Sequence, residues 1–293
     1  TAWTTIGRMH RDAQQWPQAI QAALQGHASD PQAQGPLILG LTLLPTGSSE
    51  IRRMLDQAMQ GSVSPDLRLG YARSLVALQA PNEALSQLRQ LTQQNPEFSP
   101  GWLLLGLLQV DLGQNQQAQQ SLTRHVALAK DSKDAEQQAG LTEALMALSQ
   151  LAQQRGELEQ ASQWLNQIPV SADPVRLAIR RAEVLDQQGR QEEARLVLTQ
   201  AQPVSAEQAQ RKALALSRWL REHQQAQQAY TTLAQALAQA PEDHELLTEQ
   251  SLVLEKLQRY DEMERVLRQL MRLRPQDAHA YNALGYSLAD RGI

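Results

Sequence analysis

The stretch Ser99–Val126, with the sequence SPGWLLLGLLQVDLGQNQQAQQSLTRHV, decides the fold that we predict for this chain. It indicates two short amphipathic helices, with a turn at Gly113 between them. Gly106 and Ala118 are small residues at the places where the two helices would cross. Two helix backbones approach closely only where the side chains between them are small. The stretch therefore predicts a tightly packed helix pair.

The same pattern recurs along the chain at intervals of about 32 to 43 residues. With Ser99 as position 1, position 8 is Gly, Ala or Ser in nine consecutive units, and position 20 is alanine in six of them. Proline at position 32 ends four second helices, because proline lacks an N–H and disfavours helix in the residue before it. We therefore predict an all-α solenoid without β-strands, with the unit at 33–64 the least regular. The predicted units are 1–32, 33–64, 65–98, 99–141, 142–174, 175–209, 210–243, 244–277 and a half unit at 278–293.

A period near 34 residues with these small and apolar positions resembles the tetratricopeptide repeat (TPR). The resemblance is clearest in the first unit, Trp3-x-x-Ile6-Gly7, and in the last, Tyr281-x-x-Leu284-Gly285. It implies a single domain over residues 1–293, built as a right-handed superhelical solenoid of about eight and a half helix-turn-helix units. It also implies that the first helix of each unit lines a concave face on which a peptide or partner protein binds.

Positions 2, 5, 6, 9, 12 and 13 of the first helices point into that face in the resembled family. Transferred residue by residue, they predict an apolar face in units two to four and an arginine-rich face in units six and seven. Exposed apolar patches usually mark interfaces, and arginine pairs well with carboxylates. Alternatively, the chain itself covers the leucines, and the arginines form ion pairs along their own helices. The predicted binding residues are Leu37, Ile38, Leu41, Leu69, Arg73, Leu103, Leu104, Leu107, Val110, Arg176, Arg180, Arg211, Arg218 and Arg221.

No pattern in the sequence indicates catalysis, a metal or a cofactor. The chain has no cysteine, and its six histidines never recur at a spacing of three or four that would place two ligands on one helix face. Phosphate-binding loops and nucleophile elbows are also missing from the sequence. We therefore predict a protein that is not an enzyme, and we expect His10 and His125 to pack in the core.

Composition bears on partners and compartment. A net charge of −4 gives no attraction to nucleic acid, and the longest apolar run, Leu37–Leu44, is too short to span a bilayer. The chain holds 45 glutamines but four lysines, which resembles exported repeat proteins of Gram-negative bacteria. We therefore favour the periplasm or the outer membrane over the cytoplasm. We also expect a piece of a longer protein, since Thr1 is not methionine and the last unit lacks its second helix.

The function that these features predict is a non-catalytic protein–protein interaction scaffold. One alternative is a substrate-selecting repeat region of a larger enzyme such as a glycosyltransferase. Another is a self-assembly module that associates through the open C-terminal helix at 278–293. About nine extra residues near Lys130–Gln138 either lengthen a helix pair or its connection, or contact a partner.

Overall fold

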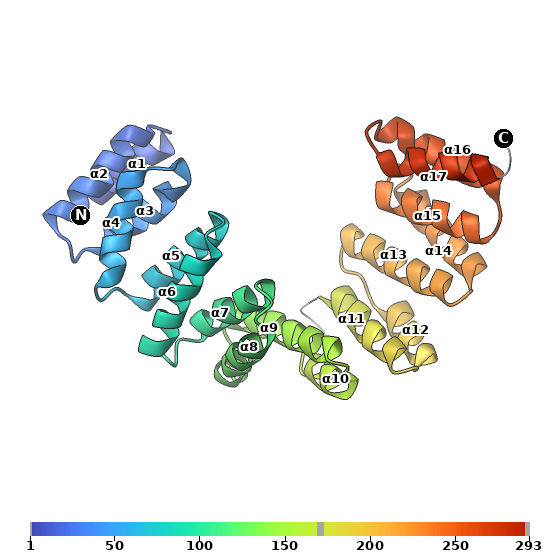
Figure 1. Ribbon diagram of the computed structural model, residues 1–293, viewed down its shortest axis with the longest axis horizontal. Helices are drawn as coiled ribbons and strands as arrows, with labels where there is room; N and C mark the ends of the chain where they lie inside the picture. The colour runs from blue at the N-terminus through green and yellow to red at the C-terminus, as the bar shows by residue number, and fades with distance from the viewer. Residues whose placement is uncertain (1, 169–172, 291–293) are drawn as a thin grey trace. The chain divides into compact units, whose positions relative to one another are not determined.

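The computed structural model describes residues 2–168 and 173–290, and within these ranges it contains helices but no β-strand (Figure 1). The predicted all-α repeat fold is therefore confirmed. The chain divides into two compact halves, which we call unit 1 (Thr1–Leu151) and unit 2 (Ala152–Ile293). Each of these two units holds several of the predicted repeats. None of the helices in the described ranges combines the length and the apolar character that crossing a membrane requires.

Unit 1 consists of helix pairs that follow the predicted repeat. Each second helix packs against the first helix that precedes it, and α2 and α6 also pack against the first helix that follows. The first helices are α1 (Ala2–Asp12), α3 (Gln34–Leu43), α5 (Pro65–Ala77), α7 (Ser99–Asp111) and α9 (Ala135–Gln154), and the second helices are α2 (Trp16–Ser29), α4 (Ser49–Gln60), α6 (Pro81–Gln94) and α8 (Asn115–Ala129).

Unit 2 continues the same alternation of second and first helices. How the two units join is not described, so the single solenoid over residues 1–293 stays a prediction. The second helices are α10 (Leu158–Asn166), α12 (Gln191–Gln200), α14 (Ala226–Gln239) and α16 (Tyr260–Leu273), and the first helices are α11 (Pro174–Gln187), α13 (Ala206–Glu222), α15 (His244–Lys256) and α17 (Ala278–Asp290).

The small residue at position 8 is buried in eight of the nine predicted units, from Gly7 to Ser251. At Gly106, an added Cβ would lie 2.6 Å from Cγ of Leu122 and 3.1 Å from its backbone nitrogen, because α8 crosses α7 at this point. At Gly285 of α17, an added Cβ would meet nothing within 4 Å among the described residues. The crossing helix, and not the first helix itself, therefore requires the small side chain.

The turn between the two helices of a unit has a left-handed residue at position 15 in all eight predicted units that contain this position. Four of these residues are glycine, but four are glutamine, with φ between 56° and 62°. Left-handed backbone costs a non-glycine residue roughly 1–2 kcal/mol. The repeat therefore imposes one turn conformation whichever residue occupies it. The glycines are Gly47, Gly113, Gly156 and Gly189, and the glutamines are Gln14, Gln79, Gln224 and Gln258.

Two segments depart from the regular unit. Near Lys130–Gln138 the extra residues lengthen the helix pair: α8 has 15 residues, α9 has 20, and a turn separates Ala129 from Ala135. The expected longer pair of helices is thus confirmed, and contact of this segment with a partner stays a prediction. In the irregular unit at 33–64, a 3₁₀ turn, η1 (Leu44–Thr46), lengthens the connection before Ser48 caps α4 by accepting a hydrogen bond from the Ile51 nitrogen.

The crossing at position 8 predicts opposite effects for one substitution at two sites. Gly106→Ala should lower the free energy of unfolding by about 1–3 kcal/mol, because the new methyl overlaps Leu122 and a packed core resists overfilling. Gly285→Ala should be neutral or raise it by up to about 1 kcal/mol through helix propensity. Urea unfolding followed by circular dichroism measures both. Equal losses at the two sites would contradict the crossing argument.

The left-handed turn predicts that glutamine at position 15 makes the protein less stable than glycine would. Gln79→Gly should raise the free energy of unfolding by about 0.5–1 kcal/mol, because the relief of left-handed strain exceeds the extra flexibility of the unfolded chain. Gln120→Gly, at an exposed site inside α8, should instead lower it by about 1 kcal/mol. The prediction fails if thermal melts show both variants destabilised.

Candidate functional site

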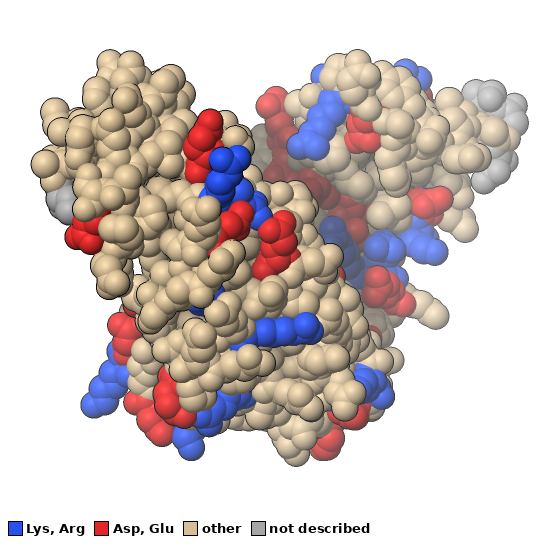
Figure 2. All heavy atoms as spheres, turned by 60° about the vertical axis from the view of Figure 1, so that its left-hand side comes forward, with Lys and Arg blue, Asp and Glu red and all other residues tan. Residues whose placement is uncertain are grey.

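Unit 1 leaves apolar side chains accessible on neighbouring first helices, and we call these residues the first-helix surface. Ile38 is 43% exposed, and the remaining apolar members are half-buried. They adjoin because α3 packs against α5, and α5 packs against α7. Figure 2 shows the charged side chains of unit 1 in small mixed groups, with broad uncharged areas between them. The members are Ile38 and Leu41 of α3, the exposed Arg73 of α5, and Leu103, Leu104, Leu107 and Val110 of α7.

Two of the predicted binding residues are core side chains. Leu37 is 3% exposed and Leu69 is 4% exposed, and both belong to the hydrophobic core of unit 1. Both occupy position 5, which lies about 60° around the helix from the buried position 8, because each residue advances about 100°. Leu103 occupies the same position of α7 and is half-buried. The predicted exposure of Leu37 and Leu69 is therefore wrong.

Four of the five predicted arginines of unit 2 pair with carboxylates of the chain itself. The alternative interpretation, ion pairs along the helices, is correct for Arg180 and Arg211, and Arg176 also has an interaction partner within the chain. Arg218 and Arg221 both reach Glu249, a buried carboxylate of the next first helix. The nitrogen–oxygen distances are 2.6 Å for Arg180–Glu183, 3.0 Å for Arg211–Asp173, 2.7 Å for Arg211–Glu207, 3.5 Å for Arg218–Glu249 and 2.7 Å for Arg221–Glu249.

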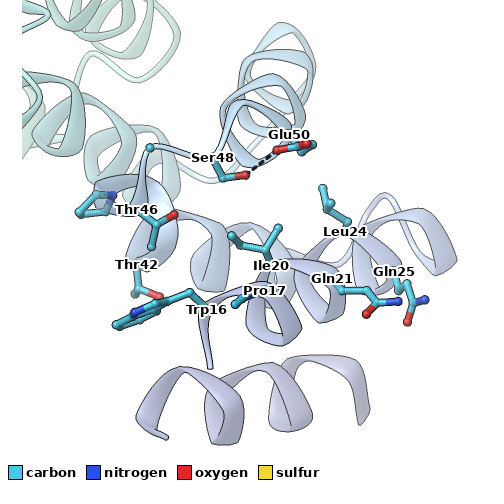
Figure 3. A pocket seen from close by; sticks show the side chains of 12 residues that line it. Trp16, Pro17, Ile20, Gln21, Leu24, Gln25, Thr42, Thr46, Ser48 and Glu50 are labelled. Carbon is cyan, nitrogen blue, oxygen red and sulfur yellow. Dashed lines mark hydrogen bonds between the residues drawn. The ribbon is translucent and has the colours of Figure 1, made fainter. Parts of the chain in front are cut away.

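A pocket that the sequence analysis missed lies in unit 1 between α2 and the α3–α4 connection (Figure 3). Its volume is about 920 Å³. Trp16 is exposed and Ile20 and Leu24 are half-buried, and their spacing of four residues along one side of α2 was the available signal. The other lining residues are Pro17, Gln21 and Gln25 of α2 and, on the facing wall, Thr42, Pro45, Thr46, Gly47, Ser48 and Glu50.

The two walls of this pocket differ in their free hydrogen-bonding groups. On the facing wall, Thr42 and Thr46 donate to backbone carbonyls of their own turn, and Ser48 Oγ donates to Glu50 at 2.9 Å. A hydrogen bond from its own backbone N–H, followed by the one from Ser48, lowers the pKa of Glu50, so its carboxylate is charged at neutral pH. On α2, no hydrogen bond is found within the described residues for the side chains of Trp16, Gln21 and Gln25.

The described residues hold no group of three or more His, Asp or Glu side chains that could bind a metal. His125 is buried, as expected, and its Nδ1 lies 2.8 Å from Ser99 Oγ. His10 is half-buried and pairs with Gln15 near the surface, so the core position expected for it is wrong. Burial lowers the pKa of His125, which favours its neutral form. His125 is therefore a buried packing side chain that is hydrogen-bonded to Ser99.

The buried histidine predicts a pH-dependent stability. The folded protein holds the pKa of His125 below its ordinary value of 6.5, so the unfolded chain takes up the proton first as the pH falls. The free energy of unfolding should therefore fall below about pH 6.5, by at most about 1.4 kcal/mol per pH unit for this one proton. Urea unfolding between pH 8 and pH 5 measures the slope. His125→Asn retains a polar group near Ser99 and should remove this component, and an unchanged slope would contradict the assignment.

Comparisons with known proteins agree with this architecture. The tetratricopeptide repeat family matches residues 102–136, which overlap the stretch Ser99–Val126 that decided the predicted fold. A TPR repeat-containing protein of Pseudomonas aeruginosa is 32% identical over 144 residues, which are 49% of this chain and 24% of that protein. The match thus spans about a quarter of the relative's length. Together with the helix pairs described above, these findings support a TPR-type repeat architecture for this chain.

Solved structures show the same fold at low sequence identity. The type IV pilus biogenesis factor PilW superimposes with a TM-score of 0.57 at 14% identity, over 76% of this chain and 100% of that chain. The Cut9–Hcn1 hetero-tetramer of the APC/C gives a TM-score of 0.52 at 16% identity, over 96% of this chain and 54% of that chain. These likenesses concern the fold alone.

Proposed function

We propose that this protein is a non-catalytic scaffold that binds a partner protein on the first-helix surface of unit 1. The TPR fold is consistent with such a protein–protein interaction role. The observation that carries the proposal is the row of accessible apolar side chains on adjacent first helices, of which Ile38, Leu104 and Leu107 are examples. Contiguous apolar surface on a protein is a common mark of an interface.

The chemistry of the surface suggests the kind of segment that it binds. Six of its seven members are apolar, and Arg73 is the charged one. No ion pair of Arg73 is found among the residues that the structure describes. A partner segment with several apolar side chains and an acidic group near Arg73 would complement it, because guanidinium and carboxylate form paired hydrogen bonds. The arginine-rich surface of unit 2 is a weaker candidate for acidic partners, since its own carboxylates compete.

Self-association is the second candidate function, and one observation favours it. Tyr286 of α17 is 76% exposed, and Tyr281 of the same helix is also exposed. A second copy could cover these rings. Light scattering across a concentration series distinguishes this role, because a strict monomer at high concentration excludes it.

For compartment, we propose the periplasm or the outer membrane, with the glutamine-rich, lysine-poor composition as support. A role as the substrate-selecting region of a larger enzyme requires a catalytic domain elsewhere in the same gene.

The proposal predicts that charge on the first-helix surface abolishes partner binding. In Leu104→Glu with Leu107→Glu, the amount of specific partner recovered from native lysate should fall at least tenfold, because two carboxylates would lose their hydration in the interface. Helicity by circular dichroism should stay unchanged, since both side chains are only half-buried. Quantitative mass spectrometry of immobilised protein makes the measurement.

A matched control carries the same charge change elsewhere. Leu196→Glu with Leu273→Glu alters two exposed leucines on the second helices α12 and α16, and this variant should retain the partner. Loss of the same proteins from both double variants, or no protein lost selectively from the first, would overturn the proposal. Loss of helicity in Leu104→Glu with Leu107→Glu would show that these leucines belong to the core, and it would contradict the proposed binding surface.

A further inference from the structure

The pocket between α2 and the α3–α4 connection is lined by other residues than those of the first-helix surface. We propose that it binds an extended, proline-containing segment of a partner protein, with a basic side chain of that segment at Glu50. One wall of the pocket belongs to the irregular unit at 33–64, where η1 lengthens the connection between the two helices. Its existence therefore depends on the least regular part of the repeat.

The length of the pocket suits a short extended segment. Its α2 wall runs from Trp16 to Gln25, about 13.5 Å at 1.5 Å per helical residue. A polyproline II segment advances about 3.1 Å per residue, so about four residues would fill this wall. The volume of about 920 Å³ accommodates a segment of that size with one side left open to solvent.

The free hydrogen-bond donors on α2 favour a bound segment with an extended backbone over one with a helical backbone. The indole N–H of Trp16 and the amide groups of Gln21 and Gln25 have no hydrogen-bond partner among the described residues. A bound helix would use its carbonyls internally and leave these donors unmatched. A polyproline II backbone makes no internal hydrogen bonds, so its carbonyls are free to accept from them.

The lining favours proline in particular. Trp16 is 41% exposed, and Pro17, Ile20 and Leu24 continue its apolar surface along the floor (Figure 3). Rigid prolyl rings bury well against an exposed indole, and a segment that is already extended loses little conformational entropy on binding. A flexible apolar segment would gain the same contacts at a larger entropic cost.

The charge of Glu50 indicates that a basic residue accompanies the proline in the bound segment. Glu50 is the charged side chain in the lining, and its lowered pKa keeps it ionised. Arg53 contributes to that lowering, but no ion pair between Arg53 and Glu50 is found in the described part of the chain. The carboxylate accepts from its own backbone N–H and from the Ser48 and Ser49 hydroxyls, and lysine or arginine of the bound segment can approach its exposed side.

Selection from a random octapeptide display library tests this proposal without assuming a sequence. The full chain is the bait, and peptides that also bind Trp16→Ala are removed, so that binders of the first-helix surface are discarded. We expect the remaining peptides to be enriched in proline, with lysine or arginine at a fixed distance. Enrichment of amphipathic helical or acidic peptides, or no enrichment at all, would overturn the proposal.

Binding of the best selected peptide to variants then locates the site. By isothermal titration calorimetry, Trp16→Ala should weaken binding at least tenfold, as expected for an aromatic anchor. Glu50→Gln should weaken it about two- to fivefold, as expected for one exposed charge pair. Glu136→Gln, which removes a first-turn glutamate from α9, is the matched control and should have no effect. Leu104→Glu with Leu107→Glu should also leave this affinity unchanged, so the two sites can fail independently.

Discussion

The close crossing of two helices at position 8 is the constraint on which this structure depends. Size matters more than polarity there, as the serines at this position show. Ser149 and Ser217 are fully buried, and their hydroxyls have no hydrogen-bond partner in the described ranges. An unsatisfied buried hydroxyl costs about 1–3 kcal/mol. Ala72 and Ala182 occupy the same position and are also buried, so the crossing requires a small side chain and accepts either an apolar or a polar one.

Polar side chains near the helix starts connect successive repeats. Asp243 caps α15 by accepting from the Leu246 nitrogen at 2.9 Å with one oxygen, and it accepts from Gln210 of the preceding first helix, α13, at 2.6 Å with the other. Asp277 repeats the arrangement with His244 at 2.6 Å, and that hydrogen bond lowers the pKa of Asp277. One carboxylate thus caps a helix and fixes the distance to the neighbouring repeat. A solenoid needs both functions, because each repeat is stabilised only by its neighbours.

The sequence predicted most of the fold, because small residues at a fixed spacing leave few ways to pack. It predicted the surface less well. Leu37 and Leu104 have the same residue type on equivalent helices, and only their angle from position 8 separates core from surface. The ion pairs of Arg218 and Arg221 depend on Glu249 of the next repeat, a contact that no spacing within one helix reveals. The left-handed glutamines were also missed, since glycine is the usual signal for that conformation.

The distribution of charge explains why unit 1 is the better candidate for partner recognition. An exposed ion pair contributes about 0–1 kcal/mol, and an incoming carboxylate would first have to displace Glu183 or Glu249 from its arginine. Burial of one leucine or isoleucine side chain contributes about 1.5–3 kcal/mol when it is complete. Ile38 and Trp16 are exposed, and Leu104 is half-buried, so a partner can cover them without displacing a carboxylate. Affinity therefore comes most readily from the apolar sites of unit 1, while the arginines of unit 2 chiefly hold their own repeats together.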